Sequence, residues 1–194
     1  MSEPMKVQLR TKAESNMPKT PSDSRAGPKV GSRTAFTFFV NVLPGHEQTL
    51  RELIASNQGN PEGDEAIKEI GTLHEFRWVL FDDDKRVVFC SSFDGSWDKY
   101  IQDFASSAIG DMIDTNLQHV EGWIGIKDPR ASEWLLEHAV PAVYYNCAYP
   151  QPSVKQLWQM QALQRAFQQA LDNPGAAEAL QHPALKPLLE LAAD

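Results

Sequence analysis

The sequence has only two cysteines, Cys90 and Cys147, and both stand in apolar runs. Free cysteines in such surroundings act as small buried hydrophobes, and disulfides are rare in reducing compartments. The chain has no apolar run that approaches the roughly 20 residues a membrane helix needs. Its first residues lack the apolar core of a secretory signal. We therefore expect a cytoplasmic protein with two free thiols and no membrane insertion.

Positive charge is also scarce, because the chain has 18 Lys and Arg but 26 Asp and Glu. The net charge of −8 argues against nucleic-acid binding. Residues 1–33 are the exception, with seven basic and three acidic residues, a net +4 that leaves −12 for the rest of the chain. This leader holds four prolines and only three branched apolar residues. Such a segment cannot bury enough surface to offset the entropy of ordering, so we predict a disordered basic leader.

The motifs of well-known active sites are missing as well. The chain has no Gly-rich phosphate loop, G-x-S-x-G elbow, H-E-x-x-H or C-x-x-C. Its five histidines are scattered, and none pairs with another His or Cys at metal spacing. The acidic run Asp82–Asp84 lacks the spaced ligands of a calcium loop and is predicted to be a polar hairpin tip. We therefore expect no metal site.

The strongest structural signal is a predicted hairpin on either side of Asp82–Asp84, where apolar and polar side chains alternate. With the tip at the last two aspartates, Trp78 pairs with Phe89 on one face, and Arg77 pairs with Cys90 on the other. The first face is strongly apolar and predicts core. The second face mixes apolar and polar groups, which is the usual composition of a ligand pocket.

Hydrophobic periodicity predicts a strand, a helix, the two strands of the hairpin, a second helix and a last strand. Outside the hairpin, these elements cover residues 34–43, 47–57, 96–117 and 123–126. The order is that of the ferredoxin-like βαββαβ fold, an α+β fold in which both helices cover one face of an antiparallel sheet. The other face still carries apolar side chains, so a second copy of the chain, the C-terminal segment or a ligand has to cover it.

The remaining residues extend this core. Ala142–Ala148 is predicted to be a further strand, and a capping box at Ser153 begins a long helix. Prolines limit the residues after this helix to short helical pieces. We expect a ferredoxin-like α/β-barrel domain over residues 34–150 and a C-terminal helical extension over residues 151–194.

Three polar residues on the uncovered face are candidates for catalysis. Arg77 stands in mid-strand between two aromatic residues, and a guanidinium there needs an anionic or carbonyl partner. Recognition of a substrate is one interpretation; an ion pair with Glu75, two residues away on the same face, is the other. If Arg77 binds substrate, Glu75 and Asn41 are the residues that would orient it or exchange protons.

Four further residues are candidates for the pocket wall. Phe39 and Trp123 would pack on the apolar part of a substrate, and Tyr145 would turn its hydroxyl into the pocket. Cys90 stands opposite Arg77, which is the one feature that would favour its thiolate. A buried, inert thiol is the alternative for Cys90.

Several stretches resemble a known group of proteins. TAFTFFVNVLPG with its following helix, HEFRWVLFDDDKRVVFCSSFDG and SWDKYIQDF resemble the dimeric α/β-barrel proteins of ferredoxin-like fold, over residues 34–126. That group includes antibiotic-biosynthesis monooxygenases and haem-degrading monooxygenases. The motifs H-x-x-R-W and F-D-G-S-W-x-x-Y are closer to poorly characterised bacterial proteins of this fold. The resemblance implies a homodimer whose two sheets face each other, with a pocket beside each sheet.

Haem is the one cofactor that the resemblance suggests. Haem-degrading members carry a ligand histidine within the second helix, whereas residues 96–118 hold no histidine here. His74 and His119 are the remaining candidates, and a hydrogen-bonded structural role is the simpler interpretation of His74. We therefore expect no cofactor, with haem as the alternative.

The sequence favours a small-molecule-binding enzyme of specialised or oxidative metabolism, an oxidoreductase of the cofactor-independent monooxygenase type. Its substrate would be a small apolar or aromatic molecule with a carbonyl or anionic group. Two alternatives stay open. One is a haem-binding protein with peroxidase-like or haem-degrading activity, and the other is a non-catalytic dimeric scaffold whose leader and C-terminal helices dock a partner.

Overall fold

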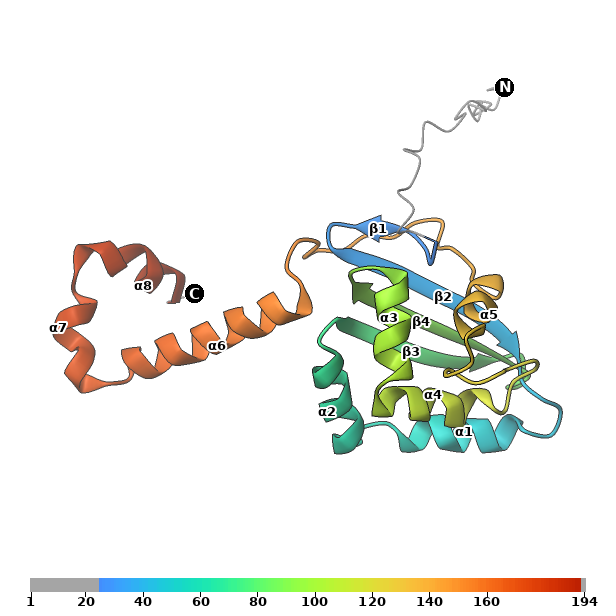
Figure 1. The fold of residues 1–194 in the computed structure, drawn as a ribbon. Helices are drawn as coiled ribbons and strands as arrows, with labels where there is room; N and C mark the ends of the chain where they lie inside the picture. The colour runs from blue at the N-terminus through green and yellow to red at the C-terminus, as the bar shows by residue number, and fades with distance from the viewer. Residues whose placement is uncertain (1–24, 193–194) are drawn as a thin grey trace, which may run out of the picture.

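A computed structural model describes residues 25–192, so most of the predicted leader lies outside the described residues. The described chain is an α+β protein with a four-stranded antiparallel sheet in the order β1-β2-β4-β3 (Figure 1). The strands are β1 (Lys29–Val30), β2 (Arg33–Asn41), β3 (Leu73–Phe81) and β4 (Arg86–Asp94). Five helices pack on one face: α1 (Glu47–Ser56), α2 (Pro61–Ile70), α3 (Trp97–Ala105), α4 (Ala108–Leu117) and α5 (Ala131–Glu137). The folded part thus begins before residue 34, because β1 pairs with the start of β2.

The β3–β4 hairpin has the register that the alternation predicts. Trp78 pairs with Phe89, and Arg77 pairs with Cys90. Asp82–Asp84 form the tip, and all three have positive φ angles, which aspartate tolerates better than most residues. The last of them accepts hydrogen bonds from an arginine of α1, so the tip is tied to the helical layer.

Aromatic side chains fill the space between the sheet and α3. Phe36 lies 4.6 Å from Trp97 between ring centroids, and Phe93 stacks on Tyr100 at 3.9 Å. The helix begins where predicted, because the Ser96 hydroxyl accepts a hydrogen bond from a main-chain amide of its first turn. Aromatic pairs of this kind stabilise a core beyond the area they bury. Phe36 and Phe93 of the sheet thus pack on Trp97 and Tyr100 of α3.

The predicted strand over residues 123–126 is wrong. The Asp114 carboxylate of α4 accepts hydrogen bonds from Trp123 Nε1 at 3.0 Å and from the Ile126 amide at 2.7 Å. These donors therefore turn toward the helices instead of a sheet edge. A single bridge between Val42 and Val120 remains at that edge. The described residues thus form an α+β fold with a four-stranded antiparallel sheet. The last strand of the predicted βαββαβ order is missing from them.

The predicted strand over Ala142–Ala148 forms no ladder either. The edge of β2 is already occupied by β1 at its start and by a bridge between Phe38 and Ala139 further along. The segment continues past this bridge without a partner strand. Val143 is fully exposed and Tyr144 is 81% exposed.

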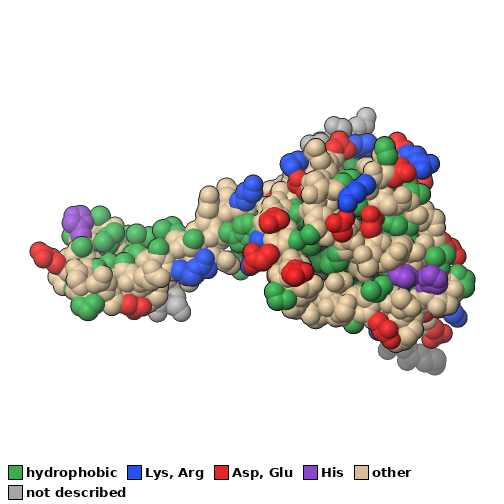
Figure 2. Space-filling model, turned by 60° about the horizontal axis from the view of Figure 1, so that its bottom comes forward, with side chains coloured by type: hydrophobic (Ala, Val, Ile, Leu, Met, Phe, Trp, Pro, Cys, Tyr) green, Lys and Arg blue, Asp and Glu red, His purple; other side chains and the backbone are tan. Residues whose placement is uncertain are grey.

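The C-terminal arm (residues 154–192) projects away from the body of the protein (Figure 1). Its long first helix begins at the predicted capping box of Ser153 and Gln156. The arm comprises α6 (Val154–Leu171), η2 (Pro174–Ala176), α7 (Ala177–Leu180), η3 (Pro183–Leu185) and α8 (Lys186–Ala192). Hydrophobic side chains lie along its surface in Figure 2. Within residues 25–192, no helix combines the length and hydrophobicity needed to cross a membrane.

Two helical glycines give a matched test of this packing. A Cβ at Gly110 of α4 would lie 2.2 Å from the Phe104 carbonyl oxygen, whereas a Cβ at Gly63 of α2 would meet nothing nearer than 4.0 Å. Gly110→Ala should therefore lower the free energy of unfolding by about 1–3 kcal/mol through overpacking. Gly63→Ala should raise it by about 0.5–1 kcal/mol through helix propensity. Urea unfolding of both variants measures this, and equal effects would contradict the packing of α4 on α3.

Candidate functional site

Two adjoining cavities lie where α1, α2 and α4 run together beside the edge strand β3 (Figure 1). Their volumes are about 240 and 320 Å³. We call them the amide cavity and the arginine cavity, and together the groove. Both cavities are lined by Asn57, Asn60, Gly63, Ile109 and Met112.

The groove exists because α1 and α2 are separate helices joined by a short loop. The Asn60 side chain caps α2 by accepting a hydrogen bond from the Glu62 amide at 3.1 Å. Pro61 occupies the first turn, where its missing N–H is not needed. Gly63 comes next and adds no side chain to the space between the helices. An ordinary helical residue there would narrow the groove.

Two buried polar groups line the groove without hydrogen-bond partners among the described residues. Asn116 of α4 lines the amide cavity, is 1% exposed, and has no partner for either its Nδ2 or its Oδ1. Trp78 of β3 lines the arginine cavity, and its buried Nε1 has no partner. Each unpaired buried polar group costs about 1–3 kcal/mol. Because these atoms are also closed to solvent, each of them opposes folding without being offered to the cavity.

Arg77 lines the arginine cavity together with its neighbours on the edge strand β3. Its side chain is exposed, and it forms no ion pair or hydrogen bond with another residue of the described chain. Glu75 is exposed too and is not bonded to it. The register turns Arg77 to the sheet face away from the helices, so it lines the groove from the edge strand β3. Asp64 of α2 lines the same cavity and is its one described carboxylate.

Phe39 and Cys90 lie on the sheet face that the helices leave open, as the register predicts. Phe39 packs edge-on against Phe81, with ring centroids 5.8 Å apart. Cys90 is half-buried and pairs with Arg77 across the strands. We call the uncovered part of this surface the open face; Val79, on the edge strand β3, is 44% exposed there.

Asn41 does not join Arg77 in one site. It pairs with Arg86 at the far end of β2, four residues beyond the position opposite Cys90, or roughly 13 Å along the strand. Its Nδ2 donates a hydrogen bond to Glu121 at 3.0 Å. Asn41 thus fixes the end of the strand.

Trp123 and Tyr145 lie at different places in the fold. Trp123 lies on the helical side, where its ring packs edge-on against Trp134 at 4.8 Å, so its predicted place on the open face is wrong. Tyr145 is half-buried beside Ser92, at one end of that face. Burial, and then the neighbouring Cys147, raise the pKa of Tyr145, although a hydrogen bond with Ser92 opposes the change.

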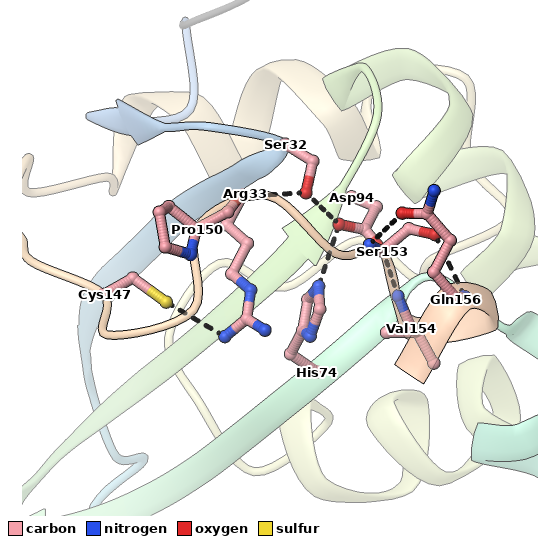
Figure 3. Close-up of polar contacts among 9 residues, drawn as sticks. All are labelled: Ser32, Arg33, His74, Asp94, Cys147, Pro150, Ser153, Val154 and Gln156. Atoms are coloured by element: carbon pink, nitrogen blue, oxygen red, sulfur yellow. Dashed lines mark hydrogen bonds and ion pairs between the residues drawn. The ribbon is translucent and has the colours of Figure 1, made fainter. Parts of the chain in front are cut away.

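Asp94 is the centre of a polar cluster that the sequence did not reveal (Figure 3). Its Oδ1 accepts hydrogen bonds from His74 Nε2 at 2.8 Å and from the Ser32 hydroxyl at 3.0 Å. Its Oδ2 accepts one from the Val154 amide at 2.7 Å. The carboxylate stands between the imidazole and the hydroxyl, so His74 is not placed to activate Ser32 as a nucleophile. The cluster joins β3, the β1–β2 turn and the root of the arm.

A second set of contacts supports this junction. The Ser32 amide donates a hydrogen bond to the Pro150 carbonyl at 2.9 Å, and the Arg33 guanidinium contacts Cys147 Sγ at 3.1 Å. A Cβ at Gly31 would lie 2.0 Å from the Pro150 oxygen, and Gly31 has a φ of 63°. Only glycine satisfies both conditions at this turn.

His46 and His119 form a half-buried pair of side chains. Their Nδ1 atoms are 2.8 Å apart, so one ring has to lack a proton there and accept the hydrogen bond. Burial, and then the charge of His46, lower the pKa of His119. Among residues 25–192 no third His, Cys, Asp or Glu completes a metal-binding group with them.

Comparison with known proteins adds no family to this description. No protein-family model, no curated protein and no solved structure matches the chain. The resemblance to dimeric α/β-barrel monooxygenases therefore stays a prediction. Functional argument has to come from the groove and from the residues that line it.

Replacing Asp94 with alanine should lower the free energy of unfolding by about 3 kcal/mol, because it leaves His74 and the Val154 amide buried without their acceptor. Urea unfolding measures the loss, and amide exchange should quicken at Val154. Asp98→Ala is the matched control, since Asp98 is 76% exposed in its pair with Arg25. A loss no larger than that of the control would contradict the role assigned to Asp94.

Proposed function

We propose that this protein binds a small, largely apolar molecule that carries a carbonyl or anionic group, and that Arg77 binds this group at the mouth of the groove. One observation carries the proposal: the arginine cavity combines an unpaired guanidinium with apolar walls. Those walls include Phe76, Ile67 and Met112. A pocket of apolar walls with a few convergent polar groups is the usual form of a ligand site.

The charges beside the cavity limit the ligand further. A guanidinium offers several donors in a plane that suits a carboxylate or a carbonyl oxygen. Asp64 lines the same cavity and would repel a second negative charge. A monoanion or a neutral carbonyl compound therefore fits better than a dianion. The volume of about 320 Å³ lies at the lower end of the roughly 300–1,000 Å³ found for ligand pockets, so the cavity suits a small molecule.

Chemistry on the bound molecule stays a prediction. Cofactor-independent oxygenation is what the resemblance implies, and the groove would supply an apolar, partly enclosed place for it. The residues predicted for that chemistry do not all meet, because Asn41 and Trp123 lie away from Arg77. Haem binding also stays a prediction; His74 and His119 each use one ring nitrogen for a protein partner.

Arg77→Met should weaken the binding of benzoate, a small apolar monoanion, by about 10- to 100-fold, since a hydrogen bond to a charged group contributes about 1.5–3 kcal/mol. Titration calorimetry or NMR titration measures the affinity. Arg86→Met is the matched control, because Arg86 lies in the same hairpin but stacks on Phe81 and pairs with Asp82. Equal benzoate affinity in Arg77→Met and in the unchanged protein would refute the proposal.

A second variant tests the groove instead of the charge. Gly63→Leu should abolish benzoate binding by filling the space between the helices, since Gly63 lines both cavities. Glu69→Leu on the same helix adds the same side chain away from the groove and should leave binding unchanged. Benzoate binding that survives Gly63→Leu would place the site elsewhere.

We propose further that two copies of the chain pair through the open face. Phe39 and Val88 are half-buried there, and Val79 is 44% exposed in the single chain. Val79→Glu should turn a dimer into a monomer, because a buried unpaired carboxylate is costly. Light scattering after size exclusion measures the mass. Val143→Glu, at a fully exposed position in the segment that pairs with no strand, is the control; a monomer in the unchanged protein would refute the pairing.

A further inference from the structure

We infer that His46 and His119 form a binding site for a divalent transition-metal ion of the class that prefers imidazole nitrogen, represented by Zn²⁺. The ligands are the two Nδ1 atoms that face each other, and water completes the coordination. The site lies outside the groove, because neither histidine lines the amide cavity or the arginine cavity. The inference therefore goes beyond the proposed binding of an organic molecule and does not depend on it.

The distance between the two rings suits a shared ion. Their Nδ1 atoms are 2.8 Å apart, and the ring planes are inclined to each other by 54°. Two nitrogens that bind one ion at about 2.0–2.1 Å, with an angle of about 90–110° between them, lie roughly 2.8–3.4 Å apart. The observed separation is at the lower end of this range. An ion can therefore enter between the nitrogens if they move apart by about half an ångström or less.

The protons of the pair permit this exchange. In the contact as it stands, one Nδ1 carries a proton and the other accepts the hydrogen bond. Neither Nε2 atom has a hydrogen-bond partner among residues 25–192, so the first ring can move its proton from Nδ1 to Nε2 through solvent. Each ring then stays neutral and offers the lone pair of its Nδ1 to the ion.

Main-chain hydrogen bonds hold both histidines in place. The Leu43 amide donates a hydrogen bond to the His119 carbonyl at 2.9 Å, and the His46 amide donates one to the Leu43 carbonyl at 2.9 Å. The bridge between Val42 and Val120 lies next to these bonds in the sequence. The two ligands are 73 positions apart in the sequence, and the fold brings them into one frame. A metal site needs its ligands positioned in this way.

This pair differs from the other three histidines of the chain. His74 bonds a carboxylate, His138 a main-chain carbonyl and His182 a main-chain amide. His46 and His119 have only each other as side-chain partners among the described residues. A shared proton uses one of the two facing lone pairs, whereas a metal ion uses both.

The ligand set selects the class of ion. Imidazole suits Zn²⁺, Ni²⁺ and Cu²⁺, whereas Mg²⁺ and Ca²⁺ prefer oxygen ligands. No third His, Cys, Asp or Glu within residues 25–192 joins the pair, so the remaining coordination positions are open to water. Closed four-ligand sites are typical of structural zinc. We therefore expect a reversibly bound ion that a chelator removes.

The test is a titration of the full chain, without an affinity tag, with zinc chloride near neutral pH. In NMR spectra the imidazole resonances of His46 and His119 should shift and saturate with Zn²⁺, whereas those of the other histidines should not, and Mg²⁺ should move none of them. His46→Gln and His119→Gln should each weaken Zn²⁺ binding, measured by calorimetry, by about tenfold or more, since loss of even a supporting contact to a metal ligand costs roughly 10- to 100-fold. His182→Gln is the matched control and should keep the affinity, because His182 is exposed on the arm.

The outcome is decided by the two rings themselves. Zn²⁺ that leaves the His46 and His119 resonances in place, or moves those of His182 equally, overturns the inference and leaves a hydrogen-bonded pair only. Equal Zn²⁺ affinity in His46→Gln, His119→Gln and His182→Gln overturns it as well. The resonances of the unchanged protein answer the question even if a variant does not fold. Benzoate binding through Arg77 is tested separately, because the two sites share no residue.

Discussion

The structure depends on the buried carboxylate of Asp94. It joins three segments that are distant in the sequence, because its partners are Ser32, His74 and Val154. A carboxylate in a buried site is stable only when its oxygens accept several hydrogen bonds, and here the three donors come from three different elements. The requirement to satisfy one charge therefore fixes where the β1–β2 turn, the start of β3 and the root of the arm meet.

That junction also fixes the wall of the groove. With the amide of Val154 bound to Asp94, the next turn of α6 lies against the end of α2, where Lys155 and Trp158 approach Gly71. Gly71 ends α2 in a left-handed conformation, so the helix stops beneath the arm. The other end of α2 is set by its Asn60 cap. Both ends of this helix are thus defined, and the gap between α1, α2 and α4 lies along it.

Local patterns in the sequence predict local structure well. The parity of the hairpin gives the pairing of Arg77 with Cys90, and Ser96 marks the start of α3. The prediction of a strand near Trp123 was wrong because the Asp114 carboxylate of α4 accepts a hydrogen bond from the Trp123 indole. The alternation of apolar and polar residues carries no information about such a partner. The groove was missed because three helices form it. One sequence signal was available: Asn116 interrupts the apolar stripe of α4 next to Leu117, where a core residue is expected.

Asp94 and Asn116 are both buried polar residues, but they affect the stability of the fold in opposite directions. The oxygens of Asp94 accept hydrogen bonds from three described donors, so its burial serves the fold. Asn116 is buried as deeply but has no partner among the described residues, so its burial opposes the fold. An apolar residue at that position would remove the opposition and close the cavity wall. Asp94 is therefore an example of burial that the fold satisfies, whereas the buried amide of Asn116 is a cost that the rest of the packing has to offset.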